Sequence, residues 1–87
     1  MTKSLDSKTF GLSSRDRLIE ISKNHWALVI HRKSRIVVAD GRRILEKIKK
    51  AQEKAPDVKF SIQTNAPVCS KTGAFLREMG VEIRKLD

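Results

Sequence analysis

The chain has 87 residues and carries 19 lysine and arginine side chains against 10 aspartate and glutamate side chains, so its formal net charge is +9. This length suits one domain, and an apolar content of 39% supports a core, which excludes a second domain and disorder of the whole chain. The basic excess favours partners that carry negative charge.

The basic character is concentrated in residues 1–55, which hold 14 of the basic and 6 of the acidic side chains. The single cysteine, Cys69, excludes an intramolecular disulfide and a cysteine-based zinc site, and is typical of a reducing compartment. The first residues show no apolar secretion signal, and no window approaches the roughly 20 apolar residues of a membrane span. We therefore expect a cytoplasmic protein with no membrane partner.

The N-terminal third is expected to contain an arm followed by strands. Residues 1–14 are rich in serine, threonine and glycine, which indicates a flexible N-terminal arm, although the alternation of Phe10 and Leu12 leaves an added edge strand open. Residues 15–87 are then predicted to form a single α/β domain. Three short apolar runs, RLIEIS, HWALVIH and RIVVA, follow one another with breaks short enough for hairpins, and predict a three-strand antiparallel meander.

Two helices and two strands are expected after the meander. Asp40 fits an N-cap, and the run DGRRILEKIKKAQEKA places Ile44, Leu45, Ile48, Ala51 and Ala55 on one face of a helix. VKFSIQ alternates as a half-buried strand does, a second helix follows TNAP and ends at Gly80, and VEI supplies a last strand. The predicted fold class is therefore α/β (α+β), a mixed sheet with order β-β-β-α-β-α-β, in which an antiparallel meander precedes two βαβ crossovers.

The predicted order also constrains which faces of the sheet are covered. If the last three strands run parallel and step in one direction, right-handed crossovers place both helices on the same face. The other face is then bare, unless the first 14 residues or a second subunit cover it or the strand order reverses. Because HWALVIH is apolar on both faces, a homodimeric protein-interaction or regulatory module is the alternative hypothesis for this chain.

The order of elements resembles the core of the ribonuclease H-like fold. An active member needs acidic metal ligands on the first strand, the first helix and the fourth strand. Glu20 and Glu46 fit the first two roles, but the strand VKFSIQTN offers Gln63 and Asn65 instead of a carboxylate. Nuclease activity by that mechanism is therefore excluded, and we expect no catalytic residue, no metal site and no cofactor.

The stretch TNAPVCSKTG stands where a strand is expected to meet a helix. It lacks the glycines of a nucleoside-triphosphate-binding loop, yet a helix N-terminus attracts anions. The candidate anion-binding residues are Asn65, Cys69, Ser70, Lys71 and Thr72. The preferred interpretation is a plain helix start, capped by Asn65 or Thr64, with Pro67 in the first turn and a structural cysteine.

The basic residues form two groups along the sequence. HRKSR is predicted to lie at a hairpin tip, and six basic residues of the first helix face solvent: Arg42, Arg43, Lys47, Lys49, Lys50 and Lys54. The candidate nucleic-acid-binding residues are Arg32, Lys33, Arg35, Arg42, Arg43, Lys47 and Lys50. The alternative is ordinary surface pairing, because Glu46 stands four residues before Lys50. Since exposed aromatics for base stacking are missing, the predicted function is a basic, non-enzymatic module that binds nucleic acid without sequence preference.

Overall fold

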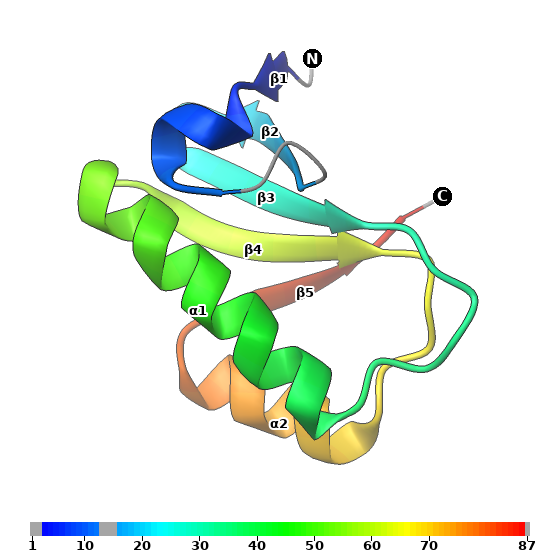
Figure 1. The fold of residues 1–87 in the computed structure, drawn as a ribbon. Coiled ribbons are helices and arrows are strands. Elements are labelled where there is room, and N and C mark those ends of the chain that lie inside the picture. The colour runs from blue at the N-terminus through cyan, green and yellow to red at the C-terminus, as the bar shows by residue number, and fades with distance from the viewer. Residues whose placement is uncertain (1–2, 13–15, 87) are drawn as a thin grey trace.

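The computed structural model describes residues 3–12 and 16–86. These residues form a five-stranded mixed sheet with two α-helices (Figure 1). The elements are β1 (Lys3–Leu5), the 3-10 helix η1 (Ser7–Phe10), β2 (Arg17–Ser22), β3 (His25–Ile30), α1 (Val38–Lys54), β4 (Lys59–Thr64), α2 (Ser70–Glu78) and β5 (Glu82–Lys85). The predicted fold class and the order β-β-β-α-β-α-β are confirmed. Within the described residues, no helix is long and apolar enough to cross a membrane.

The strands lie side by side in the order of the chain, β1-β2-β3-β4-β5. β1 and β3 pair with β2 antiparallel, whereas β3, β4 and β5 run parallel to one another. Because the parallel strands step across the sheet in one direction, α1 and α2 cover the same face (Figure 1). The carboxyl ends of the parallel strands therefore meet the N-termini of both helices at one edge of the fold.

The third strand of the meander differs from the one that the sequence predicts. RIVVA is not a strand, because Ile36 forms only an isolated parallel bridge with Val68 and α1 already begins at Val38. The backbone of Ile36 bonds to the carbonyl of Pro67 (2.9 Å) and to the N–H of Cys69 (3.0 Å), so it joins the connection before α2. β1 completes the meander instead. An apolar, β-branched run such as RIVVA suits a strand or a buried connection, because packing against neighbouring side chains decides whether a strand forms.

Residues 7–12, which follow β1, pack on the helix-covered side of the sheet. Phe10 lies in η1 rather than in an edge strand, and its ring meets that of Trp26 at 4.8 Å and 71°. Trp26 in turn meets Phe60 at 5.7 Å and 84°, and Leu12 is buried in the core. The described part of this segment therefore does not cover the opposite face of the sheet. The flexibility expected for residues 1–14 stays a prediction, and residues 1, 2, 13 and 14 lie outside the described residues.

The core lies between the helices and the sheet. The predicted inner face of α1 is confirmed for Ile44, Leu45, Ile48 and Ala51, whereas Ala55 is the C-cap and is only partly buried. The core cluster also takes residues from β2, β3, β4 and α2: Leu18, Leu28, Phe60, Ile62 and Leu76. On the opposite face, strand alternation and register place Ile19, Ala27 and Ser61 in one row, and each is at most 7% exposed. Neighbouring side chains thus already enclose the centre of the open face.

Helix α1 begins about one turn earlier than the sequence predicts. Val37 is the N-cap, and Asp40 lies in the first turn, where its Oδ2 accepts the N–H of Val37 at 3.1 Å. The prediction of Asp40 as the N-cap is therefore wrong. Gly41 is buried inside α1, where a Cβ would lie 2.8 Å from Cγ2 of Thr72, so it lets α1 and α2 approach closely.

Candidate functional site

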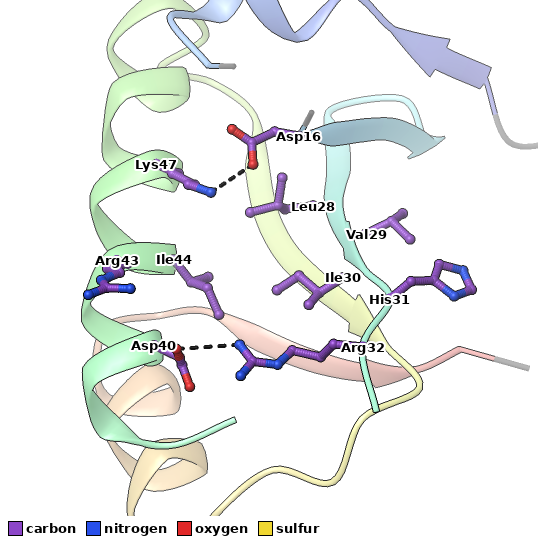
Figure 2. A pocket seen from close by; sticks show the side chains of 10 residues that line it. All are labelled: Asp16, Leu28, Val29, Ile30, His31, Arg32, Asp40, Arg43, Ile44 and Lys47. Carbon is purple, nitrogen blue, oxygen red and sulfur yellow. Dashed lines mark hydrogen bonds and ion pairs between the residues drawn. The ribbon is translucent and has the colours of Figure 1, made fainter. Parts of the chain in front are cut away.

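A groove of about 300 Å³ lies between α1 and the carboxyl-terminal half of β3 (Figure 2). We call it the α1–β3 groove. It is lined by Asp16, Leu28, Val29, Ile30, His31, Arg32, Asp40, Arg43, Ile44 and Lys47. The carboxyl end of a strand, where a crossover connection leaves the sheet, is a usual position for ligand sites in α/β folds. The groove is therefore a candidate ligand site.

Two ion pairs cross this groove. Lys47 Nζ lies 2.7 Å from Asp16 Oδ1, and Arg32 Nη1 lies 3.4 Å from Asp40 Oδ1 (Figure 2). The Asp16 side chain is 12% exposed and that of Lys47 is 44% exposed, while the values for Asp40 and Arg32 are 20% and 35%. In both pairs the carboxylate lies deeper and the cation lies nearer the solvent. The groove therefore presents positive charge to an approaching ligand.

Asp40 holds the start of α1 and Arg32 at the same time. The bond from the Val37 N–H, followed by the bond and charge of Arg32 and the charge of Arg43, holds the pKa of Asp40 below its ordinary value, against the opposing effect of desolvation. Arg32 also donates from Nε and Nη2 to Ser34 Oγ, at 3.1 and 2.9 Å. Its backbone N–H donates to Asn65 Oδ1 at 3.1 Å. Arg32 is therefore anchored to α1 and to the residue after β4.

The exposed surface of α1 carries two edges with different charge. Arg43, Lys47, Lys50 and Lys54 follow one another at helical spacing and form what we call the basic edge. Arg42, Glu46, Lys49 and Glu53 form the mixed edge, on which the two signs alternate. The basic edge begins in the α1–β3 groove with Arg43 and Lys47, and Lys50 then lies against Gly11. Arg43 and Lys47 thus belong both to the groove and to the basic edge.

The residues expected at a hairpin tip lie elsewhere. The β2–β3 turn is formed by Lys23 and Asn24, and Asn24 takes the left-handed conformation at φ 63°. Arg32, Lys33 and Arg35 belong to the connection between β3 and α1, so the predicted hairpin tip is wrong. The expectation failed because the run after Ser34 is not a strand.

The structure separates the candidate nucleic-acid-binding residues into groups. It gathers Arg32, Arg43 and Lys47 in the groove, and Lys50 lies on the same basic edge of α1. Arg42 belongs to the mixed edge, Lys33 is exposed in the β3–α1 connection, and the charge of Arg35 acts on Cys69. Sequence reasoning missed Asp16, which pairs with a lysine 31 residues away. No local pattern signals that pairing.

The start of α2 is built differently from the expected one. Cys69 is the N-cap, so Asn65 and Thr64 do not cap this helix, and Pro67 precedes it. Asn65 instead bonds to the backbone of Arg32. The Thr64 hydroxyl donates to the Ile30 carbonyl at 2.8 Å and accepts the Ala66 N–H at 3.0 Å. The connection before α2 therefore fixes the connection before α1.

The candidate anion-binding residues do not converge on one point. Asn65 is directed to Arg32, and Thr72 is fully buried against α1, whereas Ser70 and Lys71 are exposed. Cys69 is half-buried, and the backbone N–H groups of Lys71 and Thr72, with the charge of Arg35, lower the pKa of its thiol. This arrangement favours a helix start that carries an acidified thiol over a cradle for an anion.

Side chains of the types that bind metal ions are spread over the described part of the fold. No group of three or more histidine, cysteine, aspartate and glutamate side chains among them lies close enough to hold a metal ion. Glu20 and Glu46, which fitted two ligand positions of the ribonuclease H-like pattern, do not line the α1–β3 groove. The two carboxylates that do line it are each engaged by a cationic side chain.

Comparison with known proteins gives a likeness in fold. No protein-family model matches the chain, and no curated protein matches it. An EndoMS–dsDNA2 complex superposes with a TM-score of 0.73 and 19% identity, over 99% of this chain and 36% of that chain. A repair endonuclease from Pyrococcus abyssi (TM-score 0.65, 11% identity) matches over 82% of this chain and 31% of its own. EndoMS in apo form (TM-score 0.65, 19% identity) matches over 82% and 33%. The chain thus spans about a third of each structure, and at these identities the likeness establishes a shared fold alone.

Proposed function

We propose that this chain is a non-enzymatic module that binds duplex DNA through its phosphate backbone, without sequence preference. The observation that carries the proposal is the row of cations on the basic edge of α1, two of which, Arg43 and Lys47, also line the α1–β3 groove with Arg32. The likeness to a chain solved in complex with double-stranded DNA supports DNA as the anionic partner. A cytoplasmic location and a domain boundary after residue 14 remain part of the proposal.

The length of the basic edge sets the scale of the expected contact. Arg43 and Lys54 are separated by about 16 Å along the helix, at about 1.5 Å per residue. One DNA strand presents a phosphate every 3.4 Å or so of duplex axis, so about five phosphates lie along that length, and the four cations of the basic edge can contact about three to four of them. The logarithm of the binding constant should then fall with the logarithm of salt concentration with a slope of about −3 to −4.

The aromatic side chains favour backbone contact over base stacking. The rings of Phe10, Trp26 and Phe60 pack edge to face on one another beneath the helices. Proteins that bind single strands usually present such rings to successive bases. The surface of α1 offers charge without exposed rings, which suits a paired duplex whose bases are already stacked.

Comparison of two double charge-reversal variants, one on each edge of α1, tests the proposal. Lys50→Glu with Lys54→Glu reverses the basic edge, and Arg42→Glu with Lys49→Glu reverses the mixed edge by the same total charge. All four side chains are exposed. We expect the first variant to weaken binding of a short labelled duplex by about tenfold or more at physiological salt and to flatten the salt slope. The second should change affinity by about twofold or less, which the loss of general attraction alone accounts for.

The measurement is fluorescence anisotropy over a series from low to physiological salt, repeated with two duplexes of unrelated sequence. Equal affinities for the two sequences are expected. Equal effects of the two variants would show that only net charge matters, and would contradict a defined interface. Binding that does not respond to salt would contradict contact with phosphates.

A homodimeric interaction module is the second candidate. The observation in its favour is the face of the sheet opposite α1 and α2, which no helix covers in the described part of the chain (Figure 1). Sedimentation at increasing protein concentration tests it directly. A monomer over the whole concentration range would remove this candidate. A dimer whose DNA affinity does not change when the basic edge is reversed would favour the interaction module over the DNA-binding module.

A further inference from the structure

The α1–β3 groove carries its own negative charge beside the cations that are proposed to meet phosphate. Asp16 and Asp40 stand among Arg32, Arg43 and Lys47. Asp40 has a structural role, since it accepts the Val37 N–H at the start of α1 and keeps a lowered pKa. Asp16 precedes β2, and its carboxylate bonds to Lys47 in the middle of α1, 31 residues away. Its pairing with Lys47 is the feature that the proposed function leaves unexplained.

Lys47 occupies the centre of the basic edge. Its ammonium is 2.7 Å from Asp16 Oδ1, the length of a charge-assisted hydrogen bond. An ammonium has three donors, and the Lys47 side chain is 44% exposed, so its outer side remains open to a ligand. A phosphate oxygen on that side would lie about two hydrogen-bond lengths, roughly 5–6 Å, from the Asp16 carboxylate. At that separation like charges repel through the protein surface.

We propose that Asp16 competes with nucleic-acid phosphate for Lys47, so that this internal ion pair holds the affinity of the groove below what its cations would give. The inference rests on the proposed function of the basic edge. The charge of Asp16 offsets that of the lysine in the free protein, and it repels a phosphate oxygen that binds the outer side of the same ammonium. The pair thereby keeps the interaction weak and readily reversible.

Asp16→Asn tests the competition because it keeps the shape and the oxygen of the side chain while it removes the charge. Freeing one cation for about one further phosphate should raise affinity about five- to tenfold near 0.1 M salt and steepen the salt slope by about 0.9. Asp57→Asn is the matched control, since Asp57 is exposed in the turn before β4 and changes the net charge equally. It should alter affinity by about twofold or less.

A double-mutant cycle assigns the gain to the ion pair. In a Lys47→Ala background, Asp16→Asn should no longer increase affinity, because the cation for which it competes is gone. A gain that persists in this background would overturn the proposal, as would an Asp16→Asn variant that binds as tightly as the parent protein or more weakly. A weaker variant would instead show that Asp16 aims Lys47 at the phosphate.

The proposed function and this inference fail in different ways. If reversal of the basic edge has no more effect than reversal of the mixed edge, the proposed function is wrong. If that reversal weakens binding but Asp16→Asn does not strengthen it, only the inference is wrong. Thermal unfolding checks that Asp16→Asn folds. In the unmodified protein, the ¹³C resonance of the Asp16 carboxylate should shift on addition of duplex DNA, and an unmoved resonance would overturn the inference without any variant.

Discussion

Replacing Gly41 by alanine should destabilise the fold, although alanine favours helices. Gly41 is buried in α1, and a Cβ at this position would lie 2.8 Å from Cγ2 of Thr72 and 3.7 Å from the Phe75 ring. Carbon atoms in contact normally lie about 3.5–4.0 Å apart, so α1 and α2 must separate by several tenths of an ångström. Thr72 is stiff about its first side-chain torsion and cannot swing aside in a helix at no cost.

The expected magnitude follows from two opposing effects. Alanine gains about 1 kcal/mol over glycine in a helix interior. Overpacking of a tight contact costs about 1–3 kcal/mol. We therefore expect the free energy of unfolding of Gly41→Ala to fall by about 1 kcal/mol, which corresponds to about 4–8 °C in the melting temperature of a domain of this size.

Gly73→Ala is the matched control for this prediction. Gly73 lies inside α2, but a Cβ there meets only Arg77 Nη2 at 3.6 Å and Ile83 Cδ1 at 3.8 Å, which are ordinary contacts. This variant should therefore gain up to about 1 kcal/mol. Urea unfolding followed by circular dichroism measures both. Adding Thr72→Ser to the Gly41→Ala variant removes Cγ2, and the double variant should therefore recover stability. Equal stabilisation by the two alanines would refute the close approach of α1 and α2.

Two further predictions concern titration. Because the Val37 N–H and Arg32 lower the pKa of Asp40, its ionised form stabilises the fold above the ordinary aspartate pKa of about 3.9, and this contribution is lost as the pH falls through the lower folded-state pKa. The advantage in unfolding free energy over Asp40→Asn should accordingly shrink below about pH 4, and a constant difference would contradict the assignment. The rate of alkylation of Cys69 by iodoacetamide, followed by mass spectrometry, should reach half its maximum below the ordinary thiol pKa of about 8.5. Arg35→Ala should move that midpoint upward, and a midpoint unmoved by this change would show that the guanidinium does not act on the thiol.

Periodic segments of the chain were predictable because their signals are local. The inner face of α1 follows from the spacing of Ile44, Leu45, Ile48 and Ala51, and all of these residues are buried. Gly80 takes φ 79° after α2, as a glycine at a helix end does. The run RIVVA was mispredicted for the same reason, since β-branched residues suit a strand locally and nothing in the run reveals its partner.

The cationic surface was predictable in composition and not in arrangement. The basic residues of α1 can be counted in the sequence, and helical spacing even separates the basic edge from the mixed edge. Their continuity with Arg32 depends on the bond from its backbone to Asn65, across 33 residues. The presence of Asp16 beside Lys47 likewise depends on how the segment before β2 meets α1.

The amino-acid sequence by itself determined the order of the elements from α1 to β5, the inner face of α1 and the excess of positive charge, because each of these depends on composition or on spacing within a few turns of chain. Only the tertiary structure decided that β1 completes the meander, that the β3–α1 connection docks against the start of α2, and that Asp16 enters the α1–β3 groove. The physical reason is that these contacts join segments that are distant in sequence. Packing and charge in the folded chain select their partners, and a local sequence pattern does not contain that information.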